Sequence, residues 1–192
     1  MTAVMQEGWS HGPFVSLDEP GRVEQVSRAQ AVAVIAHRRR REYGERFIHH
    51  AARVASGFDP MTETLQHCAA WLHAVLETTD ISEEVLSLAG VHPEVIDVVR
   101  VLTRRKGEAD DYYERIRSDP VALAVAYAAI ADNANPSRLD DLDAETRERI
   151  SHEYVRALGL LNLPEPDHWM SDTAGGYQVG NVGRFGPLFT YG

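Results

Sequence analysis

The sequence has little of what marks secreted, membrane or nucleic-acid-binding proteins. Its single cysteine, Cys68, cannot form a disulfide within the chain. The first residues lack the basic and then apolar pattern of a signal peptide, and no apolar run of membrane length follows. Acidic residues outnumber basic ones by 29 to 19, and a formal charge of −10 disfavours binding to nucleic acid. We therefore expect a cytoplasmic protein that binds a small molecule, and neither nucleic acid nor a membrane.

The alternation of apolar and polar residues that is typical of β-strands is also missing. Helical spacing is frequent, and capping residues followed by proline or glutamate indicate where several helices begin. The sequence therefore predicts an all-α protein with one domain over residues 22–162, built from seven or eight helices of modest length. We expect these helices at about residues 25–41, 47–54, 60–77, 83–89, 93–102, 110–116, 120–133 and 143–161.

The two ends differ from this helical body. Residues 1–21 form an N-terminal extension, and residues 163–192 combine many glycines with aromatic side chains. The glycines exclude a stable helix, but exposing the aromatic rings to water is costly. We expect this tail to pack over the body or over a second protomer, which would make the protein a homodimer. A disordered tail is the alternative that composition leaves open.

Four segments together resemble consecutive blocks of the HD superfamily, at residues 47–55, 69–80, 101–104 and 128–133. The nearest branch is the hydrolase domain of RelA/SpoT-type alarmone (ppGpp) phosphohydrolases. The resemblance covers roughly residues 30 to 160. It implies an HD-domain-like helical bundle with a ligand pocket between the helices, and a divalent metal held by two histidines and two aspartates.

The metal set that the resemblance implies is incomplete in this chain. The two histidines are present as His50 and His73, but alanines, Ala74 and Ala129, stand at both aspartate positions. Asp132 lies three residues beyond Ala129, close enough on a helix to be a substitute ligand. Because hard divalent ions prefer charged oxygen ligands, we expect no resident metal or other cofactor. His50 and His73 remain as residual metal candidates, and Mn²⁺ or Zn²⁺ enters only under the alternative of a surviving hydrolase.

The same helices carry candidate catalytic residues. His73 and Glu77 are four residues apart, so they share a helix face, and contact with the carboxylate would raise the pKa of the imidazole. We expect His50, His73 and Glu77 to act as acid, base or orienting groups. The other interpretation of His73 and Glu77 is a polar pair left from an ancestral metal site.

Alanines recur at successive turns of two of the predicted helices. They indicate either close packing between helices or a former metal site in which the loss of the larger side chains leaves an apolar cavity. We favour the cavity, with the aromatic tail as its cover. The expected substrate-binding residues are Arg46, Ala74, Thr78, Ala126, Ala129, Asn133 and Tyr177.

Three functions are compatible with these observations. The favoured one is a repurposed, metal-independent enzyme that acts on a small organic substrate in the interhelical pocket. The alternatives are a metal-dependent nucleotide or ppGpp-type phosphohydrolase with unusual ligands, and a non-catalytic pseudoenzyme that binds a ligand.

Overall fold

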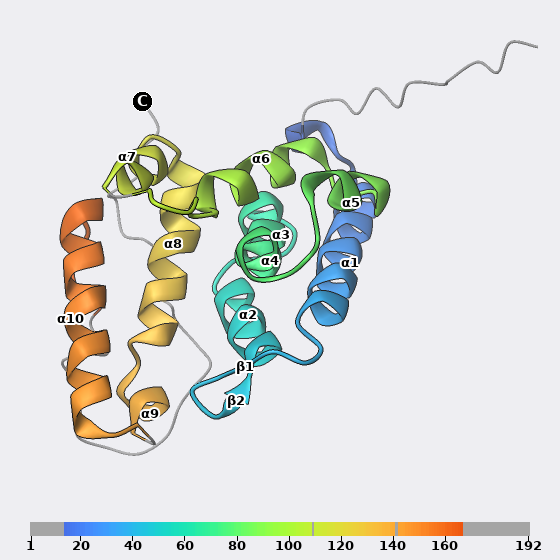
Figure 1. Ribbon diagram of the computed structural model, residues 1–192. Helices are drawn as coiled ribbons and strands as arrows, with labels where there is room; N and C mark the ends of the chain where they lie inside the picture. The colour runs from blue at the N-terminus through green and yellow to red at the C-terminus, as the bar shows by residue number, and fades with distance from the viewer. Residues whose placement is uncertain (1–13, 109, 141, 167–192) are drawn as a thin grey trace, which may run out of the picture.

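The computed structural model describes residues 14–108, 110–140 and 142–166 (Figure 1). Helices dominate this part of the chain, which confirms the all-α prediction. The only strands among the described residues are a two-residue antiparallel pair, β1 and β2. In chain order the elements are η1 Phe14–Ser16, α1 Glu19–Ala36, β1 Arg41–Glu42, β2 Glu45–Arg46, α2 Phe47–Ser56, α3 Thr64–Leu72, α4 Val75–Thr78, α5 Glu83–Leu88, α6 Pro93–Leu102, α7 Asp111–Arg117, α8 Pro120–Asn133, α9 Pro136–Leu139 and α10 Ala144–Leu161.

Side-chain caps explain why several helices begin where the sequence indicates. Asp119 accepts hydrogen bonds from two backbone N–H groups at the start of α8, where proline occupies the first helical position. At the start of α10, Asp143 accepts a hydrogen bond from the backbone of Thr146, and at the start of α5, Ser82 accepts one from the backbone of Val85. The ring of His92 accepts a bond from the backbone of Glu94 at the start of α6. These four helix starts agree with the sequence prediction.

Two helices differ from the prediction. The first begins at Glu19, after the N-cap Asp18, and ends at Ala36, so the following arginines lie in a turn and in β1.

The predicted helix from residue 60 to 77 is divided, because Asp59 caps an isolated turn and α3 begins only at Thr64. This helix stops at Leu72, and α4 follows after a break of two residues. His73 and Ala74 therefore lie at the junction of α3 and α4 rather than in one continuous helix.

The helices pack around α3, which contacts α1, α2, α6 and α8, while α10 packs against α7 and α8 (Figure 1). The core extends to Phe14, which is 5% exposed and packs its ring against His92. Phe14 and the first residues of α1 lie inside the stretch 1–21 that we expected to be an N-terminal extension. None of the described helices has the length and apolar character needed to cross a lipid bilayer. The predicted tail lies outside the described residues, apart from residues 163–166.

Candidate active site

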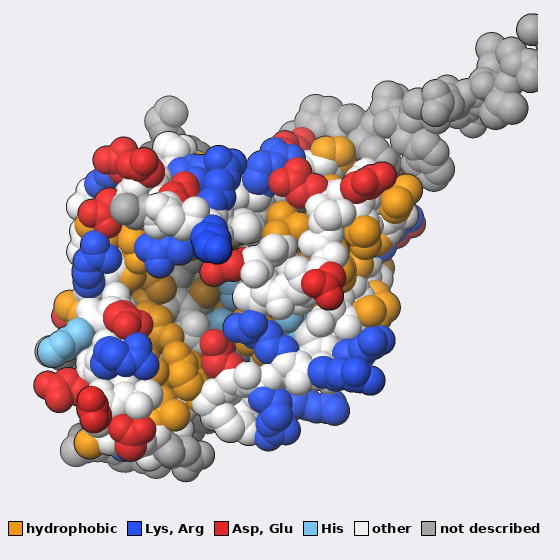
Figure 2. All heavy atoms as spheres, in the orientation of Figure 1, with side chains coloured by type: hydrophobic (Ala, Val, Ile, Leu, Met, Phe, Trp, Pro, Cys, Tyr) orange, Lys and Arg blue, Asp and Glu red, His pale blue; other side chains and the backbone are white. Residues whose placement is uncertain are grey.

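A cavity of about 220 Å³ lies between α2, the α3–α4 junction, α6, α7 and α8. Figure 2 shows the corresponding hollow in the middle of the molecule, with histidine and hydrophobic side chains inside it and charged side chains around it. Eight of the residues expected at the site line this cavity together, although they come from three separate segments of the chain. They are His50, His73, Ala74, Glu77, Thr78, Ala126, Ala129 and Asn133.

A hydrogen bond to Asp132 fixes the orientation of the His50 ring. It lies on α2, its side chain is 1% exposed, and its Nδ1 is 2.7 Å from Oδ2 of Asp132 on α8. The carboxylate can only accept a hydrogen bond, so Nδ1 carries the hydrogen and Nε2 is the nitrogen with a lone pair. Burial lowers the pKa of His50, against the opposing effect of Asp132. His50 is therefore a neutral base at neutral pH.

Two arginines keep Asp132 ionised. Nε of Arg53 lies 2.6 Å from Oδ1 of Asp132, and a terminal nitrogen of Arg138 lies 2.7 Å from Oδ2. Burial acts to raise the pKa of Asp132, but the hydrogen bonds from His50 and Arg53 and the charge of Arg138 outweigh it and lower the pKa to about 2. Both arginines also pair with Glu45. Asp132 thus stays a carboxylate and fixes the orientation of His50.

His73 differs from our expectation. Its Nδ1 lies 2.7 Å from the carbonyl oxygen of Ala70, so its Nε2 also has a free lone pair. Burial, and then the neighbouring His50, lower the pKa of His73 to about 3, whereas we expected a raised value. The exposed carboxylate of Glu77 instead accepts a hydrogen bond from the backbone N–H of Arg104, at 3.2 Å. The prediction that Glu77 raises the pKa of His73 is therefore wrong, although both residues line the cavity.

The residues present do not fit the divalent metal that the HD resemblance implies. Ala74 and Ala129 reach the cavity, but neither has a ligand atom. Asp132 bonds His50 and two arginines, so it supports the imidazole rather than replacing a lost ligand. Within residues 14–166, as far as they are described, no three histidine, cysteine, aspartate or glutamate side chains converge as a metal site.

Two predicted substrate-binding residues are not among those lining the cavity. Arg46 is exposed, and Tyr177 lies outside the described residues.

Sequence reasoning missed Arg40, which lines the cavity with its guanidinium 4.6 Å from the ring centre of Phe47. It lies in a run of four arginines, and nothing in that run distinguishes it. Only the turn between α1 and β1 places Arg40 at the cavity.

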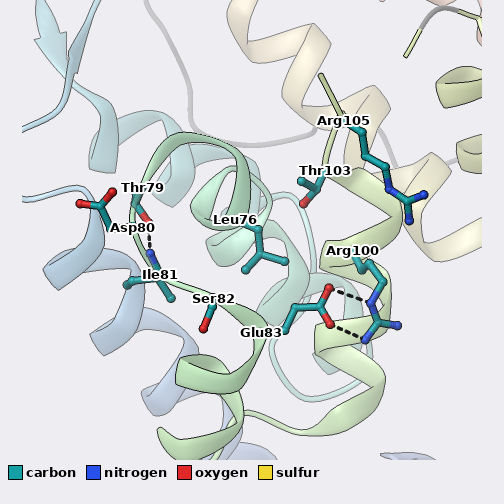
Figure 3. A pocket seen from close by; sticks show the side chains of 9 residues that line it. All are labelled: Leu76, Thr79, Asp80, Ile81, Ser82, Glu83, Arg100, Thr103 and Arg105. Atoms are coloured by element: carbon teal, nitrogen blue, oxygen red, sulfur yellow. Dashed lines mark hydrogen bonds and ion pairs between the residues drawn. The ribbon is translucent and has the colours of Figure 1, made fainter. Parts of the chain in front are cut away.

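A second hollow, of about 400 Å³, lies between α4, α5 and α6 (Figure 3). Arg100, one of the two arginines that line it, is already paired with both carboxylate oxygens of Glu83, at 2.8 and 2.7 Å. None of the residues expected at the active site lines it. We therefore place the candidate active site in the smaller cavity, which is lined by His50 and His73.

Comparison with models of protein families and with curated proteins found no match for this chain.

Proposed function

We propose that this protein is a metal-independent enzyme of HD-like architecture that transfers a proton to and from a small organic substrate. In this proposal His50 is the general base and Asp132 orients it. The substrate occupies the interhelical cavity. In this proposal the protein has the HD-like fold that the four sequence blocks indicate, but His50 rather than a bound metal ion supplies the chemistry.

The contact between His50 and Asp132 carries the proposal. A base must present a lone pair to its substrate, and hydrogen bonding of Nδ1 to a fixed carboxylate leaves Nε2 for this role. When Nε2 takes a proton from the substrate, the carboxylate stabilises the resulting imidazolium. Arg53 and Arg138 keep that carboxylate charged throughout. The proton can then return from Nε2 to another atom of the same substrate, so no external oxidant or reductant is needed.

His73 supplies a second neutral imidazole beside the first. The two ring centres are 5.1 Å apart and the rings are nearly perpendicular, at 79°. Because burial holds the pKa of His73 at about 3, its Nε2 accepts a hydrogen bond instead of carrying a charge. This favours a role in positioning a substrate O–H or N–H group next to His50.

The size of the cavity favours a small substrate. At 220 Å³ the cavity is smaller than the roughly 300–1,000 Å³ that is usual for small-molecule pockets, and a nucleotide with several phosphates would extend beyond it. Most of its wall is apolar, with contributions from α6, α7, α8 and α10: Leu102, Ile116, Val125, Ala126, Ala129, Ile130 and Leu161. A compact organic molecule therefore fits this site better than an alarmone does.

The test is consumption of small metabolites. The purified protein is incubated in EDTA with a metabolite extract, and the loss of individual compounds is followed by mass spectrometry. We expect the wild type to consume a compound, and His50→Gln to slow this by a factor of about 100 or more, which is the usual contribution of general base catalysis. His49→Gln is the matched control, because His49 is the adjacent histidine and its side chain is 58% exposed.

The other outcomes separate the alternatives. Turnover that is unchanged in His50→Gln would refute the role of the base. Turnover that appears only after Mn²⁺ or Zn²⁺ is added would support the metal-dependent hydrolase. Compounds that bind but are not consumed by any form of the protein would support a ligand-binding pseudoenzyme.

A further inference from the structure

Arg40 lies at the cavity with hydrogen-bonding capacity that the protein itself does not use. Its side chain is partly buried, and its Nε has no hydrogen-bond partner in the described part of the chain. The nearest carboxylate with which it pairs is Glu42, at 3.6 Å, which is longer than a hydrogen bond. Its guanidinium is instead stacked over the ring of Phe47, which itself contacts His50.

Three other arginines are paired more closely with carboxylates, although Nε of Arg138 also lacks a hydrogen-bond partner among the described residues. Arg53 and Arg138 bond Asp132 at 2.6 and 2.7 Å, and Arg115 bonds Glu108. A buried donor without an acceptor is costly, and such groups are normally satisfied by water or a ligand. Among the described residues, Arg40 is the only cation that lines the cavity, and its guanidinium has no close carboxylate partner.

The charges around Arg40 limit which anion can bind there. Glu42 and Glu77 line the same cavity, and Arg104 lies over Tyr112, the other large aromatic residue of the wall, at 5.0 Å. The two carboxylates and the two arginines cancel in formal charge. Such a site has no net positive charge to compensate a molecule with several negative charges, such as a polyphosphate. A single carboxylate needs only one cation, and Arg40 can supply it.

The geometry points to a small monocarboxylate as the substrate class of the cavity. Its carboxylate binds the guanidinium of Arg40, and its apolar body lies against Ala126, Ala129 and Ile130. This inference rests on the proposed function and adds to it the chemical class of the substrate. Arg40 is then the residue that determines specificity, while His50 performs the proton transfer.

The experiment measures the binding of three probes of similar shape: benzoate, benzamide and benzylammonium. Calorimetry and ligand-observed NMR on the full chain give the Kd values at neutral pH. We expect benzoate to bind more tightly than the neutral and the cationic probe. Arg40→Gln should raise the Kd for benzoate about tenfold or more, because a hydrogen bond to a charged group is lost. Arg40→Lys should restore part of the affinity, since it keeps the charge but not the planar fork.

Arg46→Gln is the matched control, because this exposed arginine lies nearby in β2 and does not line the cavity. Benzamide or benzylammonium binding as well as benzoate would overturn the inference. So would an unchanged Kd in Arg40→Gln, or no benzoate binding at millimolar concentration.

His50→Gln separates this inference from the proposed function. This variant should still bind benzoate, because the carboxylate site is intact. Benzoate binding that depends on Arg40, together with normal turnover in His50→Gln, would support the substrate class and refute the general base.

Discussion

His37 offers the sharpest test of the structure, because burial and missing partners both act on one side chain. It follows α1, is 1% exposed, and packs 4.6 Å from the ring centre of Phe47. Neither ring nitrogen has a hydrogen-bond partner among the described residues. Burial, then the charge of Arg40 and the neighbouring His50, lower the pKa of His37 to about 4. We expect His37→Leu to stabilise the protein, and to do so more strongly in acid.

The size of the effect follows from proton binding. In the unfolded chain His37 has a pKa near 6.5, so between pH 7 and pH 5 the unfolded state takes up a proton that the folded state does not. The free energy of unfolding therefore falls as the pH falls, by about 2 kcal/mol for this residue. His73, with a pKa of about 3, adds a similar amount. His37→Leu should remove only the part of this pH-dependent loss that comes from His37.

Urea unfolding followed by far-UV circular dichroism measures both effects. At pH 7 the variant should be more stable by roughly 1 to 3 kcal/mol, because two buried nitrogens without partners are replaced by an apolar side chain. At pH 5 the advantage should grow by about 2 kcal/mol. His49→Leu serves as the control and should show neither change, since His49 is exposed. An equal loss of stability from pH 7 to pH 5 in wild type and His37→Leu would refute a neutral, buried His37.

Two further predictions concern the cavity. Asp132→Asn should lower the free energy of unfolding by roughly 3 kcal/mol in urea titrations, because it removes the charge that pairs with two largely buried arginines. A loss below about 1 kcal/mol would show that water compensates these charges. Ala74→Asp combined with Ala129→Asp should produce Mn²⁺ binding in equilibrium dialysis, because both side chains reach the cavity that holds His50 and His73. If the double variant binds no more Mn²⁺ than the wild type, the HD resemblance does not extend to the geometry of the metal site.

Much of the fold could be predicted because helix ends are encoded locally. An aspartate or serine before the first turn satisfies free N–H groups, and proline at the first position costs no hydrogen bond. The starts of α5, α6, α8 and α10 follow these signals. The single-turn helices α4 and α9 were not expected as separate elements, because four residues are too few to show a helical period.

The candidate site was predictable only in part. Spacing along α8 and around the α3–α4 junction identified the alanines and histidines that line the cavity. The pairing of His50 with Asp132 joins residues 82 positions apart, and the sequence indicated Asp132 only as a substitute ligand. The position of Arg40 depends on where α1 ends, which the sequence placed five residues too late. Contacts of this kind depend on packing between elements and leave no local pattern.

The distribution of charge explains why proton transfer suits this cavity better than hydrolysis of a polyphosphate. The carboxylate of Asp132 lies behind His50, and the two imidazoles that line the cavity, those of His50 and His73, have pKa values that burial lowers. In such a low-dielectric interior, a proton that moves to His50 meets the carboxylate of Asp132 at hydrogen-bond distance, where the attraction is strong. A polyphosphate would instead bring several charges to a site whose only lining cation is Arg40 among the described residues. The same arrangement that favours one mobile proton therefore disfavours a polyanionic substrate.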